Sequence, residues 1–281
     1  MRILEKHIVP EITEKIRLQE YAAGIFTSIP TKSGIKKAIK RKEILVNGKV
    51  GSTGDWVLAH QEILLLASEK PDKKVFKLKL EVIYEDDFLA VVQKPPGIPT
   101  SGNYFRTIEN ALPFNLKRSA ETDALPFPLP AHRLDAPTSG LLIIAKTRKL
   151  LTQLNLAFET REIQKAYTAL VHGLTPEKLQ ISTRIDGKDS FTSVETLQQY
   201  RRGNQDFSLL KVKPSTGRTH QIRIHLSSEG FPIAGDALYG PKSDCKKLAL
   251  AATGLEFIHS ATGEQLQFEI VPPDWCLPPA P

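Results

Sequence analysis

One short segment constrains the fold and the chemistry of this chain more than any other. Residues 132–140 read His-Arg-Leu-Asp-Ala-Pro-Thr-Ser-Gly, and an apolar run, 141–145, follows at once. Proline, threonine, serine and glycine are common turn residues, and an apolar run of this length is typical of a buried strand. The segment therefore predicts a turn that presents the carboxylate of Asp135 directly before a core strand. Taken alone, it fits both a structural turn and a catalytic carboxylate.

Four further motifs accompany residues 132–140. They are Lys94–Gly97, Lys165–Gly173, Gly217–His225 and Gly235–Gly240. Together with 132–140 they resemble the RluA-type pseudouridine synthases, which isomerise uridine to pseudouridine within RNA. So many motifs in the right order are hard to obtain by chance. The resemblance implies an isomerase that acts on RNA and needs no cofactor.

The resemblance also implies roles for single residues. Asp135 is the catalytic carboxylate, acting near C1′ of the ribose or C6 of the base, and Arg223 is the guanidinium that keeps it ionised. Tyr167 stacks on the target uracil and moves a proton from C2′ or from C5. Arg133 inserts where the extruded base was. The other expected RNA contacts are His132, Arg218, Lys36, Lys37, Lys40 and Arg41.

Several of these residues also have a plainer interpretation. Arg223 fits a structural cation, Tyr167 fits a core tyrosine with a satisfied hydroxyl, and Arg133 fits a phosphate contact. His220 and His225 fit ordinary hydrogen-bonding histidines. As metal ligands they would diverge by about 140° on a helix, without a Glu or Cys at neighbouring spacing. We therefore expect no metal site.

Charge and cysteine content narrow the partner and the compartment. Lys and Arg number 38 against 31 Asp and Glu, and the formal charge of +7 favours a polyanionic partner. Cys245 and Cys276 lack the paired spacing of a disulfide framework or a zinc cluster. The longest apolar runs fall far short of the roughly 20 residues that span a bilayer, and the first residues do not read as a secretory signal. We expect a cytoplasmic monomer without a membrane partner.

Residues 1–72 are predicted to form a small N-terminal α/β module and linker, ahead of a catalytic domain at 73–281. The predicted elements of the module are a helical stretch (12–23), a basic run (Lys36–Lys42), a hairpin turn (Asn47–Gly48) and two strands (56–59 and 63–66). This order resembles the RNA-binding module of the ribosomal protein S-four type, although Arg17-Leu18-Gln19 replaces its usual Arg-Leu-Asp. A solvated basic helix face is the alternative.

Beyond a polar linker at 68–74, short strand-like segments recur and helices are few. This spacing favours an α+β fold with a mixed, mostly antiparallel sheet, which is also the fold that the resemblance implies. At 222–226 the apolar alternation favours a strand, but we follow the resemblance and expect a helix. The other predicted elements are strands at 80–84, 88–92, 141–145, 166–171, 207–212, 248–252 and 266–270, a helix at 148–160 and a stiff extended lead-in at 125–130.

Three functions fit these observations. The first is an RNA pseudouridine synthase that acts on ribosomal RNA, with transfer RNA as the less favoured substrate. The second is an RNA-binding or RNA-remodelling protein on the same fold, and the third is a hydrolase with Asp135 as general base, for which no second acid or oxyanion cluster is evident. Ala251 stands where the family commonly has His, so we expect altered support around the site rather than inactivity.

Overall fold

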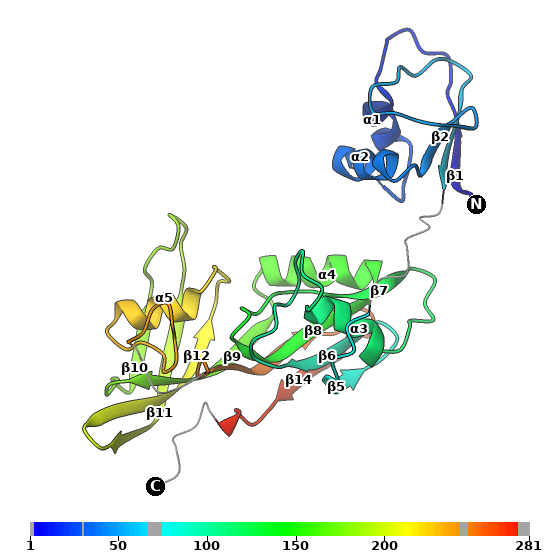
Figure 1. Cartoon of the computed structure of the whole chain (residues 1–281). Coiled ribbons are helices and arrows are strands. Elements are labelled where there is room, and N and C mark those ends of the chain that lie inside the picture. Colours follow the sequence, from blue (N-terminus) through cyan, green and yellow to red (C-terminus); the bar gives the residue numbers. More distant parts are fainter. Residues whose placement is uncertain (1–2, 30, 67–74, 242–246, 275–281) are drawn as a thin grey trace. The chain divides into compact units, whose positions relative to one another are not determined.

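The computed structural model describes residues 3–29, 31–66, 75–241 and 247–274 (Figure 1). Contacts divide the chain into two compact units, Met1–Lys73 and Lys74–Pro281. The domain boundary that the sequence predicts, near residue 72, lies outside the described residues. Each unit has a hydrophobic core of its own.

The first unit is a small sheet with helices packed on it. Its strands, in the spatial order β1-β4-β2-β3, are β1 (Ile3–Ile8), β4 (Glu62–Leu66), β2 (Ile44–Val46) and β3 (Lys49–Val50). Its helices are α1 (Leu18–Tyr21), the 3-10 helix η1 (Ala22–Gly24) and α2 (Lys32–Lys40). Leu18, Ile35 and Ile63 are fully buried between these layers.

Local predictions in the first unit meet with mixed results. The hairpin turn is confirmed, since Asn47 and Gly48 have φ of 47° and 76° and link β2 to β3. The helix predicted from residue 12 is wrong at its start, because α1 begins only at Leu18. The strand predicted at 56–59 is also wrong, because Trp56 forms an isolated bridge with Arg17 and nothing longer.

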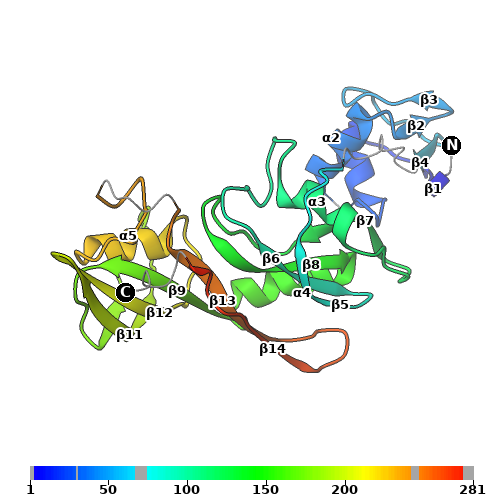
Figure 2. The ribbon, with the colours of Figure 1, turned by 60° about the horizontal axis from the view of Figure 1, so that its bottom comes forward.

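The second unit is built on one long sheet. Eight of its strands follow the spatial order β10-β11-β12-β9-β13-β8-β6-β5, while β14 pairs with β13 (Figure 2) and β7 pairs with β8. Every pair is antiparallel except β13 with β8, which confirms the mixed, mostly antiparallel α+β fold. The strands are β5 (Glu81–Glu85), β6 (Leu89–Lys94), β7 (Ala124–Pro130), β8 (Ser139–Thr147), β9 (Gln164–His172), β10 (Lys178–Ile181), β11 (Thr192–Arg202), β12 (Gln205–Pro214), β13 (Leu250–Ile258) and β14 (Gln265–Glu269).

In the described part of the second unit, three α-helices accompany this sheet: α3 (Ile108–Asn115), α4 (Arg148–Glu159) and α5 (Gln221–Ser228). The helix predicted at 148–160 is confirmed, and Thr147 caps it by accepting a hydrogen bond from the N–H of Leu150 at 3.3 Å. The helix expected at 222–226 is confirmed as well. The apolar alternation at 222–226 wrongly suggested a strand with one polar, exposed face. The polar residues Gln221 and Arg223 are in fact buried, so the alternation does not mark an exposed face.

Gly140 fixes the strand that carries the predicted catalytic turn. It has φ of 111° and faces Ala252 across the parallel β8–β13 pair. A Cβ at this position would lie 2.1 Å from the carbonyl oxygen of Ala252, so only glycine allows the two backbones to approach. All nine residues of β8 are buried, and the turn before it is therefore anchored in the core.

Candidate active site

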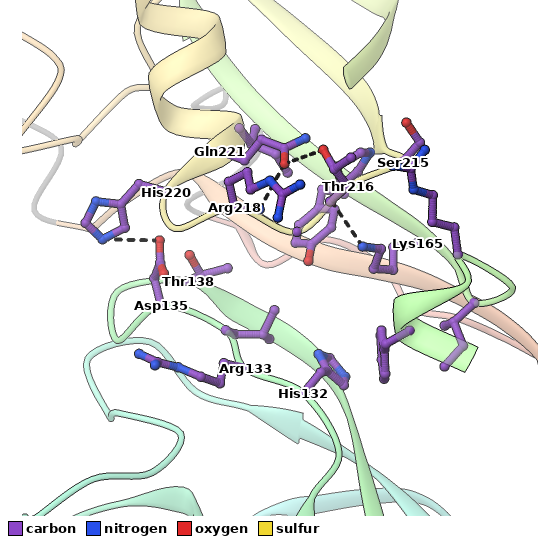
Figure 3. A pocket seen from close by; sticks show the side chains of 18 of the residues that line it. His132, Arg133, Asp135, Thr138, Lys165, Ser215, Thr216, Arg218, His220 and Gln221 are labelled. Carbon is purple, nitrogen blue, oxygen red and sulfur yellow. Dashed lines mark hydrogen bonds and ion pairs between the residues drawn. The ribbon is translucent and has the colours of Figure 1, made fainter. Parts of the chain in front are cut away.

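A cavity of about 620 Å³ lies beside the turn that contains Asp135. Its wall comes from the segment 131–138, the end of α4 and the residues after it (158–163), the start of β9, the segment from Pro214 to Arg223, and Leu250 of β13. Figure 3 shows Asp135 and His220 together at one end of this cavity and Lys165 at the other. A cavity of this size is in the usual range for a small organic ligand.

Lys94 holds the backbone of the Asp135 turn by hydrogen bonds. The Nζ of this fully buried lysine donates to the carbonyl oxygens of Pro95, Ala136 and Thr138 at 3.1, 3.0 and 2.7 Å. Burial lowers the pKa of Lys94 to about 7, against the opposing effect of the negative charge on Asp135. The motif at 94–97 thus supports the turn.

Arg223 of α5 joins two carboxylates. Its Nη1 lies 3.5 Å from Oδ2 of Asp135, while its Nε and Nη2 donate to Oδ2 and Oδ1 of Asp236 at 2.8 and 2.7 Å. Burial alone would raise the pKa of Asp236, but hydrogen bonds from Arg223 and from the N–H groups of Leu238 and Tyr239 hold it below its usual value. Asp236 therefore fixes the guanidinium that faces Asp135.

His220 also approaches Oδ2 of Asp135. This residue precedes α5 in the left-handed conformation (φ 54°, ψ 21°), which costs a residue with a Cβ about 1 kcal/mol. Its Nε2 lies 3.7 Å from Oδ2 of Asp135, and its Nδ1 shares a hydrogen bond of 3.0 Å with the hydroxyl of Tyr239. The sequence interpretation treated His220 as an ordinary hydrogen-bonding histidine.

Tyr167 of β9 lines the same cavity. Burial raises the pKa of its phenol, and the negative charge on Asp135 raises it further, so the hydroxyl stays protonated near neutral pH. Lys165, on the same face of the strand, donates to the carbonyl oxygen of Thr216 at 3.3 Å. Burial lowers the pKa of Lys165. The aromatic ring and the carboxylate thus line the same cavity.

The remaining residues predicted near the site have different surroundings. Arg133 is exposed at the cavity wall. His132 accepts a hydrogen bond from the N–H of Ile143 at 3.1 Å, and burial together with Lys165 lowers its pKa to about 3. Arg218 lines the cavity but directs its Nε and Nη2 to the carbonyl oxygen of Asp189, at 3.2 and 3.1 Å.

The other basic residues that are predicted to bind RNA lie in the first unit. Lys36, Lys37 and Lys40 are exposed on α2. Arg41 follows the helix and pairs with Glu43, its Nε and Nη2 lying 2.6 and 2.7 Å from the carboxylate oxygens. We call Lys36, Lys37 and Lys40 the α2 lysines; the fourth lysine of this helix, Lys32, pairs with Glu20.

Other sequence-based candidates have clear positions. Ala251 is fully buried in the core of the second unit. His225 is fully buried too, and its ring contacts the hydroxyls of Ser190 and Thr192 at 2.9 Å each. Cys245 and Cys276 lie outside the described residues. Within the described ranges, no cluster of His, Cys, Asp and Glu could hold a metal ion, and no helix is long and apolar enough to cross a membrane.

Sequence reasoning gave no role in this site to Asp236, Tyr239 or His220. Asp236 and Tyr239 fall in the motif at Gly235–Gly240, which was quoted for the resemblance without a role for any member. One signal could have identified Asp236. A buried guanidinium requires a charged partner, and Asp236 is the carboxylate that the motif at Gly235–Gly240 offers to Arg223.

Comparison with known proteins agrees with this geometry. A family model described as RNA pseudouridylate synthase matches residues 88–228. An uncharacterized RNA pseudouridine synthase of Aquifex aeolicus is 34% identical over 93% of this chain and 92% of its own length. Ribosomal large subunit pseudouridine synthase D of Neisseria meningitidis is 31% identical over 84% of this chain and 70% of its own length.

Solved structures share the fold. The human RNA pseudouridylate synthase domain containing 1 protein superposes with a TM-score of 0.58 at 24% identity, covering 73% of this chain and 86% of that one. The human domain containing 4 protein gives a TM-score of 0.56 at 23% identity, over 70% and 90% of the two chains.

Proposed function

This chain belongs to the RNA pseudouridylate synthase family, and from that premise we propose that it isomerises uridines of ribosomal RNA with Asp135 as the reacting carboxylate. One observation carries the proposal. Asp135 and Arg223 are 88 residues apart in the sequence, yet Nη1 and Oδ2 lie 3.5 Å apart at a cavity that Tyr167 also lines. The large-subunit pseudouridine synthase relatives favour ribosomal RNA over transfer RNA as the substrate.

The reaction places specific demands on the site. The bond from N1 to C1′ breaks, a bond from C5 to C1′ forms, C5 loses a proton and N1 gains one, so no oxidant, reductant or energy source is consumed. Asp135 supplies an anionic oxygen at C1′ or C6, and Arg223 supports its charge with a fixed guanidinium. No nucleotide cofactor or metal is expected.

Tyr167 serves in this proposal as the stacking and proton-handling group. A phenol whose pKa is raised stays neutral, so its ring can cover the uracil, and its oxygen can take the proton from C5 or C2′ only while it passes its own O–H proton to another acceptor in the site. Its position beside Asp135 in the same cavity supports this role.

A uridine within RNA reaches Asp135 only if it leaves its stack. Extrusion costs a few kcal/mol. Arg133 is exposed at the cavity wall, where it can occupy the gap that the base leaves. The α2 lysines and Arg218 add contacts to backbone phosphates, which supply affinity without sequence information. We also propose that the protein acts as a monomer in the cytoplasm.

Tritium release tests the proposal. Transcripts of large-subunit ribosomal RNA and of transfer RNA, labelled with tritium at C5 of uridine, are incubated with the wild type and with Asp135→Asn. We expect release from the ribosomal transcript with the wild type only, while the variant binds RNA within a few-fold of wild type. Release by Asp135→Asn near the wild-type rate would refute the role of Asp135. Tight binding without release by either protein would favour an RNA-binding function.

A further inference from the structure

We propose that His220 is a positioning residue that fixes the reacting carboxylate of Asp135, and that Tyr239 acts through it. This inference rests on the proposed function, because it concerns the same carboxylate. The evidence for the proposal is a closed ring of contacts. Arg223 and His220 both face Asp135, and Asp236 and Tyr239 connect Arg223 to His220.

Both contacts to Asp135 fall on one oxygen. Nη1 of Arg223 and Nε2 of His220 lie 3.5 and 3.7 Å from Oδ2. Among the described residues, no side chain hydrogen-bonds to Oδ1. A long hydrogen bond from Arg223 and the approach of His220, just beyond hydrogen-bond distance, orient the carboxylate through Oδ2 and leave Oδ1 as the oxygen that meets the substrate.

The backbone of His220 aims its ring at this oxygen. The residue has φ of 54° and ψ of 21°, a conformation that side chains with a Cβ adopt rarely and that concentrates at functional sites. Figure 3 shows the ring directed from the start of α5 towards Asp135.

Tyr239 determines which ring nitrogen carries the proton. When its hydroxyl donates to Nδ1 of His220, across 3.0 Å, the neutral ring carries its proton on Nε2, which faces Asp135. Tyr239 is itself held by Asp236, whose Oδ1 accepts its backbone N–H at 3.2 Å, and its ring centre lies 5.1 Å from the guanidinium carbon of Arg223. Asp236 thus fixes both supports of Asp135, one directly and one through Tyr239.

Two amide substitutions separate the contacts of His220. The amide nitrogen of asparagine reaches only about as far as Nδ1, so His220→Asn can keep the contact to Tyr239 and tolerates the left-handed backbone, but it loses Asp135. The amide of glutamine reaches about as far as Nε2, so His220→Gln can restore the contact to Asp135. Tyr239→Phe keeps the ring beside Arg223 and removes only the hydroxyl.

The rate constant for tritium release under single-turnover conditions, with enzyme in excess over the labelled ribosomal transcript, is the readout. We expect His220→Asn to be slower by about 10-fold, the lower end of the range for a hydrogen bond to a charged group because the contact spans 3.7 Å, and His220→Gln to recover a large part of that loss. The RNA dissociation constant is expected to change by less than about 2-fold in both, because the lost contact is within the protein.

A double-mutant cycle tests the link to Tyr239. Tyr239→Phe is expected to slow the wild type several-fold but to have little further effect on His220→Asn, because the hydroxyl acts only through the imidazole. A His220→Asn variant that releases tritium as fast as the wild type would overturn the proposal. So would a Tyr239→Phe substitution that slows the His220→Asn protein as much as it slows the wild type. A wild type that releases no tritium would instead refute the proposed function itself.

Discussion

The replacement of Asp236 by asparagine should destabilise the second unit far more than the same replacement of Asp135, although both carboxylates contact Arg223. The two differ in burial. The side chain of Asp236 is 0% exposed and that of Arg223 4%, whereas that of Asp135 is 26% exposed. Water can therefore compensate a change at Asp135 but not one at Asp236.

The size of the effect follows from these contacts. Asp236→Asn removes the charge opposite a buried guanidinium and turns an amide N–H₂ towards the N–H groups of Arg223. Removal of one partner of a buried ion pair costs about 3–5 kcal/mol, and the nearby charge of Asp135 places this case near the lower value. For a unit of this size, about 3 kcal/mol corresponds to a fall in Tm of about 6–12 °C. Asp135→Asn should cost less than about 1 kcal/mol.

Urea unfolding and tritium release, measured on the same preparations, check this pair of variants. We expect Asp135→Asn to unfold like the wild type and to release no tritium. Asp236→Asn should unfold at clearly lower urea and, while still folded, should be slower than the wild type because Arg223 is no longer fixed. Equal unfolding free energies for the two variants would show that the buried pair of Arg223 and Asp236 does not support the site as argued.

Three further predictions follow from single contacts. The pKa of His132 is about 3 in the folded chain and near 6.5 in the unfolded chain, so its contribution to the free energy of unfolding is complete above pH 6.5 and falls by about 1.4 kcal/mol per pH unit below that value. Urea unfolding at pH 7 and at pH 5 should show this loss of stability in the wild type and not in His132→Gln. Gly140→Ala should cost more than about 2 kcal/mol, because its Cβ would overlap Ala252, whereas Gly97→Ala, with open space at φ 86°, should cost about 1; equal Tm values would contradict this. Alanine at all three α2 lysines should lower RNA affinity and reduce the slope of log affinity against log salt by about 2, and an unchanged slope would remove them from the RNA interface.

Patterns of apolar residues predicted the sheet of the second unit well where strands are buried on both faces. The run at 141–145 became the centre of β8, and the segments near 90, 168 and 210 became β6, β9 and β12. β7 was not predicted as a paired strand because prolines interrupt it, and its described pairs with β8 are confined to its two ends. β10 and β11 were missed because exposed polar residues fill much of their sequence.

The candidate site was predictable only in part. The turn of Asp135 followed from local residue types, but its partner Arg223 came from the resemblance, because a contact across 88 residues leaves no local pattern. Asp236 and Tyr239 escaped for the same reason. The left-handed backbone of His220 has no signal at all in the sequence, since a glycine or asparagine there would have indicated it and a histidine does not.

The nucleoside composition of the substrate RNA tests the central claim most directly. A ribosomal RNA transcript is incubated with the wild type or with Asp135→Asn, digested to nucleosides and separated by liquid chromatography with mass detection. The account predicts that pseudouridine appears as uridine disappears, one for one and without free uracil, with the wild type only. Free uracil with loss of uridine would indicate hydrolysis, and it would contradict the assignment of Asp135 to an isomerisation.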